Sequence, residues 1–250
     1  KKALAEATKS LANEPELNVT FTIDPPGVSN ETIRLPQISR SLTKEEVMLA
    51  RGTADAFALK IRFHNEKTHN KYMPQGQLAK DLYEAMETVR VEALGARVMP
   101  GTASNIDAKI ESECVKLGYD TVSKSADAPI SAAASFLFRQ LATNRALPKG
   151  AQNIVDLRSD LFGTDATKTL KDLRETLSDQ TEFSKLTRQV IEDLGFGDQL
   201  GEDPDQNEND QQEDAEQEDQ ESDGNENQEK QEDWEQDPED GGEQDTDPSQ

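Results

Sequence analysis

The sequence predicts a mainly α-helical domain over residues 1–200, with a short β-hairpin near its N-terminus and a disordered acidic tail over residues 201–250. Apolar residues recur at helical spacing through most of the first 200 residues, and a short alternating segment precedes them. The tail holds 23 of the 51 acidic residues but one of the 27 basic residues, so it carries most of the net charge of −24. Such a composition buries too little apolar surface to offset chain entropy.

The first 40 residues are predicted to contain a helix end and two short strands. Residues 1–12 have the composition of a helix, and residues 18–24 alternate between β-branched and other side chains. A Pro-Pro-Gly turn at 25–27 separates them from a second strand-like segment at 31–35. We expect the two strands to form a β-hairpin or an extended arm. An isolated hairpin is marginal in water, so it is expected to lie on the helices.

A long helix is predicted to begin at Thr43, because Thr43 and Glu46 fit a capping box, and to continue to about residue 64. The link over 65–76 is short, which favours an antiparallel pair with the next helix, at 78–98. The side chains expected to be buried between the two helices are Leu82, Val89 and Ala93 on one and Ala50, Ala54, Phe57 and Ile61 on the other.

The helix at 78–98 is the segment around which we expect the fold to be organised. Its apolar residues fall on one face about 100° wide. Gly95 interrupts it, which destabilises a helix by roughly 1 kcal/mol relative to alanine, and we attribute this to close approach of another backbone. Gly52 in the preceding helix is expected to permit tight packing of the pair. Pro100 ends the helix, because proline disfavours a helical residue before it.

Charged residues flank the apolar face of this helix. Arg90 and Arg97 lie along one flank and Glu92 on the other, whereas Glu84 and Glu87 are expected to point further out. Arginine is suited to bidentate pairing with carboxylates. Two alternatives remain open: the charges pair inside the domain, or they contact a partner. Arg90, Glu92 and Arg97 are therefore the candidate partner-binding residues.

The remaining helices are predicted at 102–118, 130–147, 153–162, 170–177 and 183–194. The lone cysteine, Cys114, is expected to be packed rather than reactive, and it fits a reducing compartment, so we expect a cytoplasmic protein. No apolar run approaches the ~20 residues of a membrane span, and no signal peptide is evident. The chain starts at Lys1 without methionine and stops inside the acidic tract, so we expect it to be a fragment at both ends.

The two histidines are the candidate metal ligands. His64 and His69 are five residues apart, about 140° around a helix, whereas a helical zinc pair needs a spacing of four. They can meet only if the chain turns at Asn65, and a mixed nitrogen and oxygen site would then form. The candidate oxygen ligands are Glu66, Glu84 and Glu92. The alternative is that both histidines interact with the carbonyls of a helix end.

Catalytic signatures are absent from the sequence. No Gly-rich segment ends in Gly-Lys-Ser or Gly-Lys-Thr, so we expect the chain not to hydrolyse ATP itself. No local arrangement of serine, cysteine, histidine and aspartate indicates nucleophilic catalysis. We therefore assign no catalytic residue.

A resemblance to the CobT subunit of aerobic cobaltochelatase rests on several segments in a fixed order. The signature helix of that family is similar to the run Glu87-x-x-Arg90-Val91-Glu92-Ala93-Leu94-Gly95-Ala96-Arg97. Other matching segments are Arg51-Gly52-x-Ala54-Asp55 with Ala58-Leu59, the His64 to His69 link, the Met99-Pro100-Gly101 turn and Asn105. The acidic tract also lies where the family has one, so the resemblance covers most of the chain.

The resemblance implies a non-catalytic, assembly-forming subunit in an oligomeric complex. Its implied partners are a CobS-like AAA+ ATPase and a large CobN-like chelatase subunit. The whole complex uses ATP and Mg²⁺ to insert Co²⁺ into hydrogenobyrinic acid a,c-diamide, on the aerobic route to cobalamin, and we expect no cofactor to be bound by this chain. The family's C-terminal von Willebrand factor A domain, with its Asp-x-Ser-x-Ser metal loop, follows the acidic tract and is not present in this sequence.

Two other classes of function fit parts of the sequence. An acidic-tailed binding or chaperone protein for basic partners is supported by the tail alone. Residues 1–200 are nearly neutral and show no patch for nucleic acid, so no nucleic-acid partner is expected. A small metalloenzyme centred on His64 and His69 is the other alternative. A downstream Asp-x-Ser-x-Ser domain would favour the chelatase, and metal titration would test the metalloenzyme.

Overall fold

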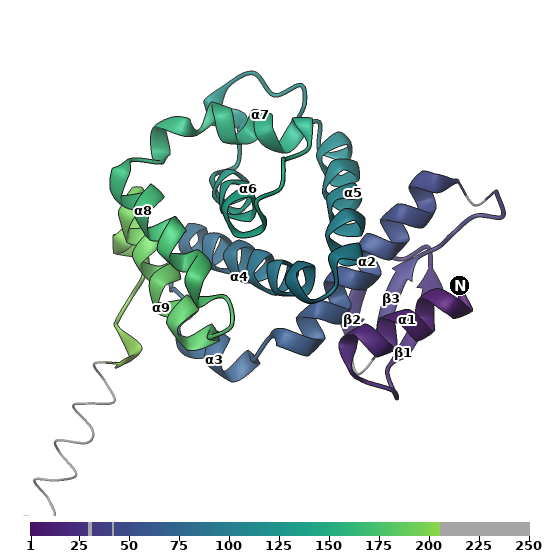
Figure 1. The fold of residues 1–250 in the computed structure, drawn as a ribbon. Coiled ribbons are helices and arrows are strands. Elements are labelled where there is room, and N and C mark those ends of the chain that lie inside the picture. The colour runs from purple at the N-terminus through teal and green to yellow at the C-terminus, as the bar shows by residue number, and fades with distance from the viewer. Residues whose placement is uncertain (30–31, 42, 206–250) are drawn as a thin grey trace, which may run out of the picture. The chain divides into compact units, whose positions relative to one another are not determined.

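The computed structural model describes residues 1–29, 32–41 and 43–205 (Figure 1). Residues Lys1–Pro204 form one compact unit. Helices make up most of this unit, and a small sheet lies near its N-terminus, which confirms the predicted mainly α class. The tail is predicted to be disordered from residue 201, and its residues 206–250 lie outside the described part of the chain. No helix among the described residues is long and apolar enough to cross a membrane.

The predicted helices all form, with shifted ends. The α-helices are α1 (Lys2–Ala12), α2 (Lys44–Phe63), α3 (Glu66–Lys71), α4 (Gln77–Val98), α5 (Pro100–Lys116), α6 (Ile130–Thr143), α7 (Lys149–Leu157), α8 (Thr164–Leu173) and α9 (Gln180–Ile191). Shorter turns of 3₁₀ or π-helix are Ser125–Asp127, Ser159–Leu161, Arg174–Thr176, Glu192–Phe196 and Gly197–Gln199. The capping box at the start of α2 is confirmed, because Thr43 Oγ1 accepts from the Glu46 N–H at 3.2 Å and the Glu46 carboxylate accepts from the Thr43 N–H. Only α3 falls in a segment predicted to be a link.

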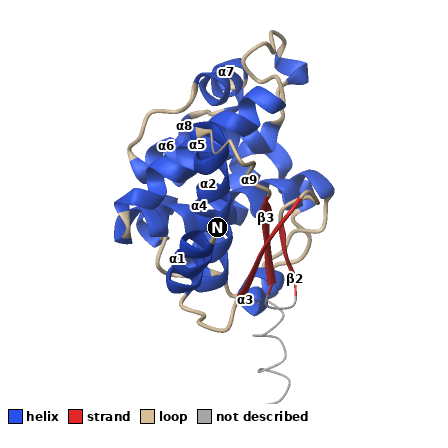
Figure 2. Cartoon of the chain, turned by 90° about the vertical axis from the view of Figure 1, so that its right-hand side faces the viewer, coloured by secondary structure: helices blue, strands red, loops and turns tan. Residues whose placement is uncertain are grey.

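The sheet differs in its pairing from the predicted hairpin. Its strands β1 (Asn18–Thr22), β2 (Gly27–Ser29) and β3 (Thr32–Pro36) are ordered β1-β3-β2 (Figure 2). The two predicted strands, β1 and β3, pair in parallel, with Val19 opposite Ile33, and the unpredicted β2 takes the antiparallel place beside β3. Ile33 and Leu35 of the central strand are fully buried, so the sheet lies on α1 and α2 as expected.

Two of the three apolar cores of the described residues contain most of the buried side chains. The first core packs Leu82, Val89 and other residues of α4 against α6, α8 and α9. The second packs α2 against α1, β3 and α5, and it contains the buried Cys114, whose pKa is raised to about 11 by burial. Leu82, Val89 and Ala93 are buried as predicted, but they lie in the first core and the apolar residues of α2 lie in the second, so the predicted contact between them is wrong. Instead, α5 packs on α2 and α6 packs on α4.

Two glycines make the close contacts that join these layers. A Cβ on Gly52 would overlap the backbone carbonyl of Asn105 in α5, so the expected tight packing occurs against α5 and not against α4. A Cβ on Gly95 would overlap the side chain of Leu59 in α2. Gly95 therefore makes room for the side chain of Leu59, whereas the sequence predicted the close approach of another backbone. The Gly95 contact places the C-terminal part of α4 beside α2, and the Gly52 contact places α2 against α5.

The last described residues are tied to the helical unit. Arg188 of α9 donates to the carbonyls of Leu200 at 3.2 Å and Glu202 at 3.0 Å. The N–H of Gly76, just before α4, donates to the Gln199 carbonyl at 2.9 Å. The compact unit thus runs to Pro204, four residues beyond the boundary expected from composition.

Candidate functional site

A buried ion pair, Glu87 and Arg90, lies at the middle of α4. The exposed fractions are 4% for Glu87 and 2% for Arg90. Arg90 Nε donates to Glu87 Oε2 at 2.7 Å, and Arg90 Nη2 donates to Glu87 Oε1 at 2.8 Å. A buried pair needs such bidentate geometry, because desolvation otherwise exceeds the attraction between the charges. The pair is therefore part of the core of the fold.

Arg90 also connects α4 to three other segments. Its Nη2 donates to the carbonyl of Phe63, the last residue of α2, at 2.7 Å, and its Nη1 donates to the Leu177 carbonyl at 3.0 Å. The carbonyls at the C-terminus of a helix lack partners within the helix and favour a cation. Nη2 is also 2.9 Å from Oε1 of Gln180, which in turn bonds the backbone N–H and C=O of Asn65. The guanidinium thus holds the junction of α2, α3, α4 and α9.

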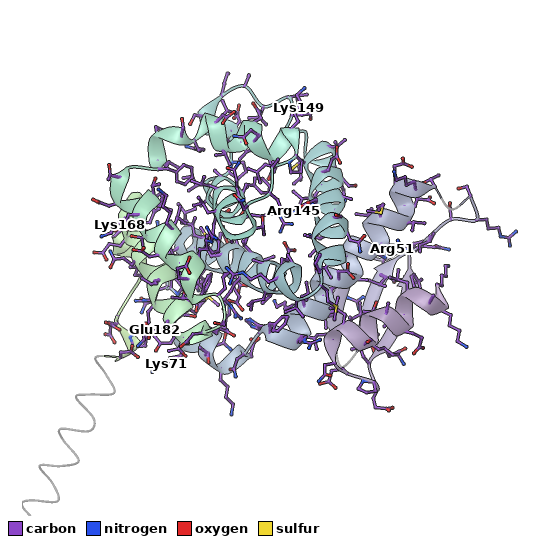
Figure 3. All side chains as sticks on the ribbon, in the orientation of Figure 1. Arg51, Lys71, Arg145, Lys149, Lys168 and Glu182 are labelled. Carbon is purple, nitrogen blue, oxygen red and sulfur yellow. The ribbon has the colours of Figure 1, made fainter. Side chains whose placement is uncertain are left out.

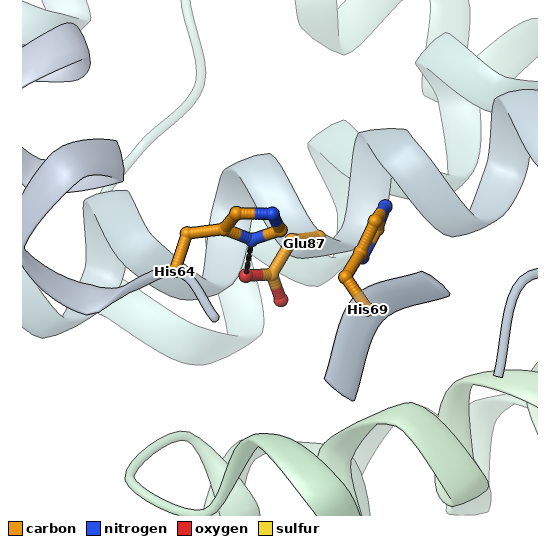
Figure 4. A group of neighbouring side chains, drawn as sticks. All are labelled: His64, His69 and Glu87. Atoms are coloured by element: carbon orange, nitrogen blue, oxygen red, sulfur yellow. Dashed lines mark hydrogen bonds and ion pairs between the residues drawn. The ribbon is translucent and has the colours of Figure 1, made fainter. Parts of the chain in front are cut away.

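His64 follows α2 directly and lies against Glu87 (Figure 4). The chain turns at Asn65, the N-cap of α3, which is the turn that the sequence required if the histidines were to meet. His64 Nδ1 is 2.7 Å from Glu87 Oε1, and His64 Nε2 is 3.2 Å from Oε2 of Glu66. Both ring nitrogens therefore face carboxylate oxygens of α3 and α4, and the histidine does not serve the helix-end carbonyls.

His69, in α3, brings a second ring to the same place. The ring centroids of His64 and His69 are 4.7 Å apart, and one potential ligand atom from each of His64, His69 and Glu87 lies within 4.8 Å of the other two. The His69 ring stacks on Tyr83, and its Nε2 is 3.1 Å from Oε1 of Glu84. Its Nδ1 is buried and has no hydrogen-bond partner among the described residues, which destabilises a fold by about 1–3 kcal/mol.

Glu92, one turn further along α4, lies in a different buried network. Arg139 of α6 donates through Nη1 to Glu92 Oε2 at 2.9 Å and through Nη2 to Asp107 Oδ1 at 2.9 Å. Asp107, in α5, also pairs with Arg145 at 2.6 Å. Glu92 therefore joins α4 to α6 and lies apart from the histidines.

The two buried glutamates of α4 have pKa values shifted in opposite directions. Burial raises the pKa of Glu87, but the hydrogen bonds from Arg90 and His64 outweigh it, so the pKa lies below its ordinary value of 4.5. Burial raises the pKa of Glu92 above that value, and the charge of Arg139 offsets this only in part. Within the described part of the chain, Arg90 pairs with no carboxylate other than Glu87, whereas Arg139 pairs with both Glu92 and Asp107.

Arg97 lies at the exposed end of α4. Its Nη2 donates to the Arg174 carbonyl at 3.3 Å. Arg97, Arg145 and Arg174 line one pocket of about 370 Å³, and Figure 3 labels Arg145 in its place after α6. Val98 and Met99, which follow Arg97 in the chain, are 59% and 38% exposed. The end of α4 thus presents both positive charge and apolar surface.

One family accounts for the whole sequence. The family model described as "Cobalamin biosynthesis protein CobT" matches residues 1–250. The chain belongs to this family. Membership in the CobT family implies involvement in cobalamin biosynthesis. No solved structure was found to match the chain.

The CobT-like segments of the sequence meet at two places in the structure. Asn105 Nδ2 donates to Asp55 Oδ2 at 2.7 Å, beside the contact that Gly52 makes with α5. The signature helix meets the His64 to His69 link through Glu87 and Arg90. The segments that carry the resemblance to the CobT family are therefore the ones that join its helices.

The structure separates the candidate partner-binding residues of this CobT family member. Arg90 and Glu92 are buried and pair with charges of the same chain, which is the first of the two alternatives, pairing inside the domain. Of the three residues, Arg97 alone is exposed. Sequence reasoning placed Glu87 outward, which is wrong because its side chain is buried, and it did not place Glu87 beside the histidines. The three-residue spacing from Glu87 to Arg90, typical of a helical ion pair, was the available signal.

Proposed function

We propose that the chain is a non-catalytic, assembly-forming subunit of an ATP-dependent aerobic cobaltochelatase. In this proposal it supports the insertion of Co²⁺ into hydrogenobyrinic acid a,c-diamide, and the whole complex uses ATP and Mg²⁺ in the cytoplasm. The observation that carries the proposal is the match of the CobT family model over residues 1–250. The missing phosphate-binding loop in the sequence supports a role beside the ATPase rather than as the ATPase.

The proposed partners are a CobS-like AAA+ ATPase and a CobN-like large subunit, in an oligomeric complex. The surface that we propose for the ATPase is the end of α4, where Arg97 lies beside the exposed side chains of Val98 and Met99. Arginines and exposed apolar side chains are typical of protein interfaces. The pocket lined by Arg97, Arg145 and Arg174 fits a carboxylate-bearing segment of the partner.

The alternative function, an acidic-tailed protein for basic partners, rests on a tail that from residue 206 onward lies outside the described part of the chain. The exposed cationic end of α4 favours the chelatase subunit, because a carrier of basic partners gains nothing from this surface. We therefore keep one proposed function.

A pull-down with the CobS-like ATPase tests this proposal on the full chain. Arg97→Ala combined with Arg174→Ala is expected to reduce binding at least about tenfold, since each exposed charge at an interface contributes on the order of 1 kcal/mol. The matched control is Lys168→Ala, an exposed cation of α8 away from this pocket, which is expected to bind like the parent. Undiminished binding by the double variant would remove this surface from the interface. Cobalt insertion or ATP hydrolysis by the chain alone would contradict the non-catalytic role.

A further inference from the structure

We propose that His64, His69 and Glu87 form a binding site for one divalent cation of the borderline group, such as Zn²⁺, Co²⁺ or Ni²⁺. The inference goes beyond the proposed function and does not depend on it, because it concerns residues within α2 to α4 alone. It departs from the expectation that this chain binds no cofactor. Two imidazoles and one carboxylate are ligands that suit these ions, whereas Mg²⁺ and Ca²⁺ prefer oxygen ligands.

The backbone brings the three ligands together from consecutive segments. His64 follows α2, His69 lies in α3 and Glu87 lies in α4, and their potential ligand atoms are within 4.8 Å of one another. Bonds of about 2.0–2.1 Å in a tetrahedral site place ligand atoms roughly 3.4 Å apart. Side-chain movements on the order of 1 Å therefore close the group around an ion, with no change in the helices.

His69 carries the observation that points most directly to a ligand. Oxygen Oε1 of Glu84 is 3.1 Å from His69 Nε2, and a carboxylate accepts a hydrogen bond, so Nε2 holds the ring proton. In this tautomer Nδ1 carries a lone pair, and it is buried and has no hydrogen-bond donor among the described residues. A metal-binding histidine commonly has this arrangement, with one nitrogen held by a carboxylate and the other directed at the ion.

His64 and Glu87 are also held in place by groups other than the ion. The close contact between His64 Nδ1 and Glu87 Oε1, at 2.7 Å, is a hydrogen bond whose proton the cation would displace to solvent. Arg90 Nε holds the other oxygen of Glu87 at 2.7 Å and keeps it in place when the ion binds. Arg90 adds a positive charge to the site, and the carboxylates of Glu84 and Glu66 offset it.

A pocket borders the site on the Glu87 side and gives a cation an approach to that carboxylate. It has a volume of about 200 Å³, and its lining includes Glu84, Glu87 and Glu92 beside Lys60 and Lys109. Carboxylates along the approach attract a cation. With three protein ligands, the ion retains one position for water or another ligand, as in open metal sites.

Metal titration of the full chain tests the inference. The acidic tail offers further carboxylates to cations, so the titration is done by calorimetry with Zn²⁺ and with Co²⁺ in the presence of excess Mg²⁺. We expect one saturable site per chain and a melting temperature that rises with Zn²⁺. The visible absorption of bound Co²⁺ is expected to indicate nitrogen and oxygen ligands. If no stoichiometric site remains in excess Mg²⁺, the proposal is wrong.

Three variants make the test specific. His69→Ala is expected to remove the site, and Glu84→Gln, at a partly exposed position, is expected to weaken Zn²⁺ binding about 10–100-fold through loss of the orienting carboxylate. The matched control is Glu182→Gln, a carboxylate of α9 that pairs with a surface lysine, and it is expected to bind Zn²⁺ like the parent. Equal Zn²⁺ affinity in all three variants would overturn the proposal.

A measurement on the unchanged protein covers the case in which His69→Ala does not fold. The chain has two histidines, so the imidazole proton resonances in an NMR spectrum report on His64 and His69 directly. Stoichiometric Co²⁺ is expected to shift and broaden both sets of resonances in the presence of excess Mg²⁺. Resonances that stay unchanged at one equivalent of Co²⁺ would overturn the proposal.

Discussion

Arg90 and Glu87 lie one turn apart on α4 and meet inside the fold through two hydrogen bonds of 2.7 and 2.8 Å. The same guanidinium reaches the last carbonyl of α2 and Gln180 at the start of α9, while the same carboxylate reaches His64. A helix with charged flanks is usually exposed on those flanks. Here the charged flank is buried because it pairs with charges and carbonyls of neighbouring segments.

The first prediction concerns the loss of this junction. Arg90→Ala leaves Glu87 as a buried carboxylate without its main partner, and it leaves the carbonyls of Phe63 and Leu177 without a donor. We expect the free energy of unfolding to fall by about 3–5 kcal/mol, as for other broken buried pairs. Arg97→Ala, at an exposed position of the same helix, is expected to change it by less than about 0.5 kcal/mol. Urea denaturation of both variants checks the difference, and equal stabilities would contradict the role of Arg90.

The pH dependence of stability is predicted to have opposite signs at the two buried glutamates. The lowered pKa of Glu87 contributes stability that is present above the unfolded value near 4.5 and is lost as the pH falls through the folded pKa. The raised pKa of Glu92 contributes stability that is fully present below that value and is lost as the pH rises through the folded pKa.

Two neutral variants separate these contributions. The destabilisation caused by Glu87→Gln is expected to be largest above about pH 4.5 and to shrink as the pH falls. The destabilisation caused by Glu92→Gln is expected to shrink as the pH rises, because the parent then has a buried charge that the variant lacks. Chemical denaturation from pH 3.5 to pH 8 measures both trends. If the destabilisation by the two variants changed with pH in the same direction, the ion pairs of Glu87 and Glu92 would differ from those in the structure.

The third prediction concerns the glycines of the helix contacts. Gly52→Ala is expected to lower the free energy of unfolding by about 1–3 kcal/mol, despite the higher helix propensity of alanine, because its Cβ would overlap the backbone of Asn105. Gly101→Ala, in the first turn of α5, has open space around the new Cβ and is expected to raise it by roughly 0.5 kcal/mol. Thermal melting of both variants tests this, and a stabilising Gly52→Ala would exclude the close contact between α2 and α5.

The fourth prediction concerns the apolar face of α4. Val89 is 5% exposed in the core shared with α6, so Val89→Asp places an unpaired charge there and is expected to lower the free energy of unfolding by at least about 3 kcal/mol. The control is Val115→Asp on α5, where valine is 67% exposed, and a change within about 0.5 kcal/mol is expected. If Val89→Asp unfolds at the same denaturant concentration as the parent, α4 does not bury this face.

The sequence by itself determined the local features of this protein. Thr43 and Glu46 specify the start of α2 through contacts three residues apart, and Pro100 specifies the end of α4 through its own ring. The helical period of apolar residues and the segments that resemble the CobT family can likewise be seen in the sequence without a fold. These features depend only on residues that are close along the chain, so the order of residues is enough to predict them.

Only the tertiary structure decided which faces and charges meet. The sequence could not show that β1 pairs in parallel with β3, that α4 packs on α6, or that Glu87 lies between Arg90 and His64. Each of these depends on segments that are distant along the chain and on how several faces compete for the same partner. A charged side chain on a helix is exposed or buried according to the partners that arrive from elsewhere, and those partners are present only in the folded chain.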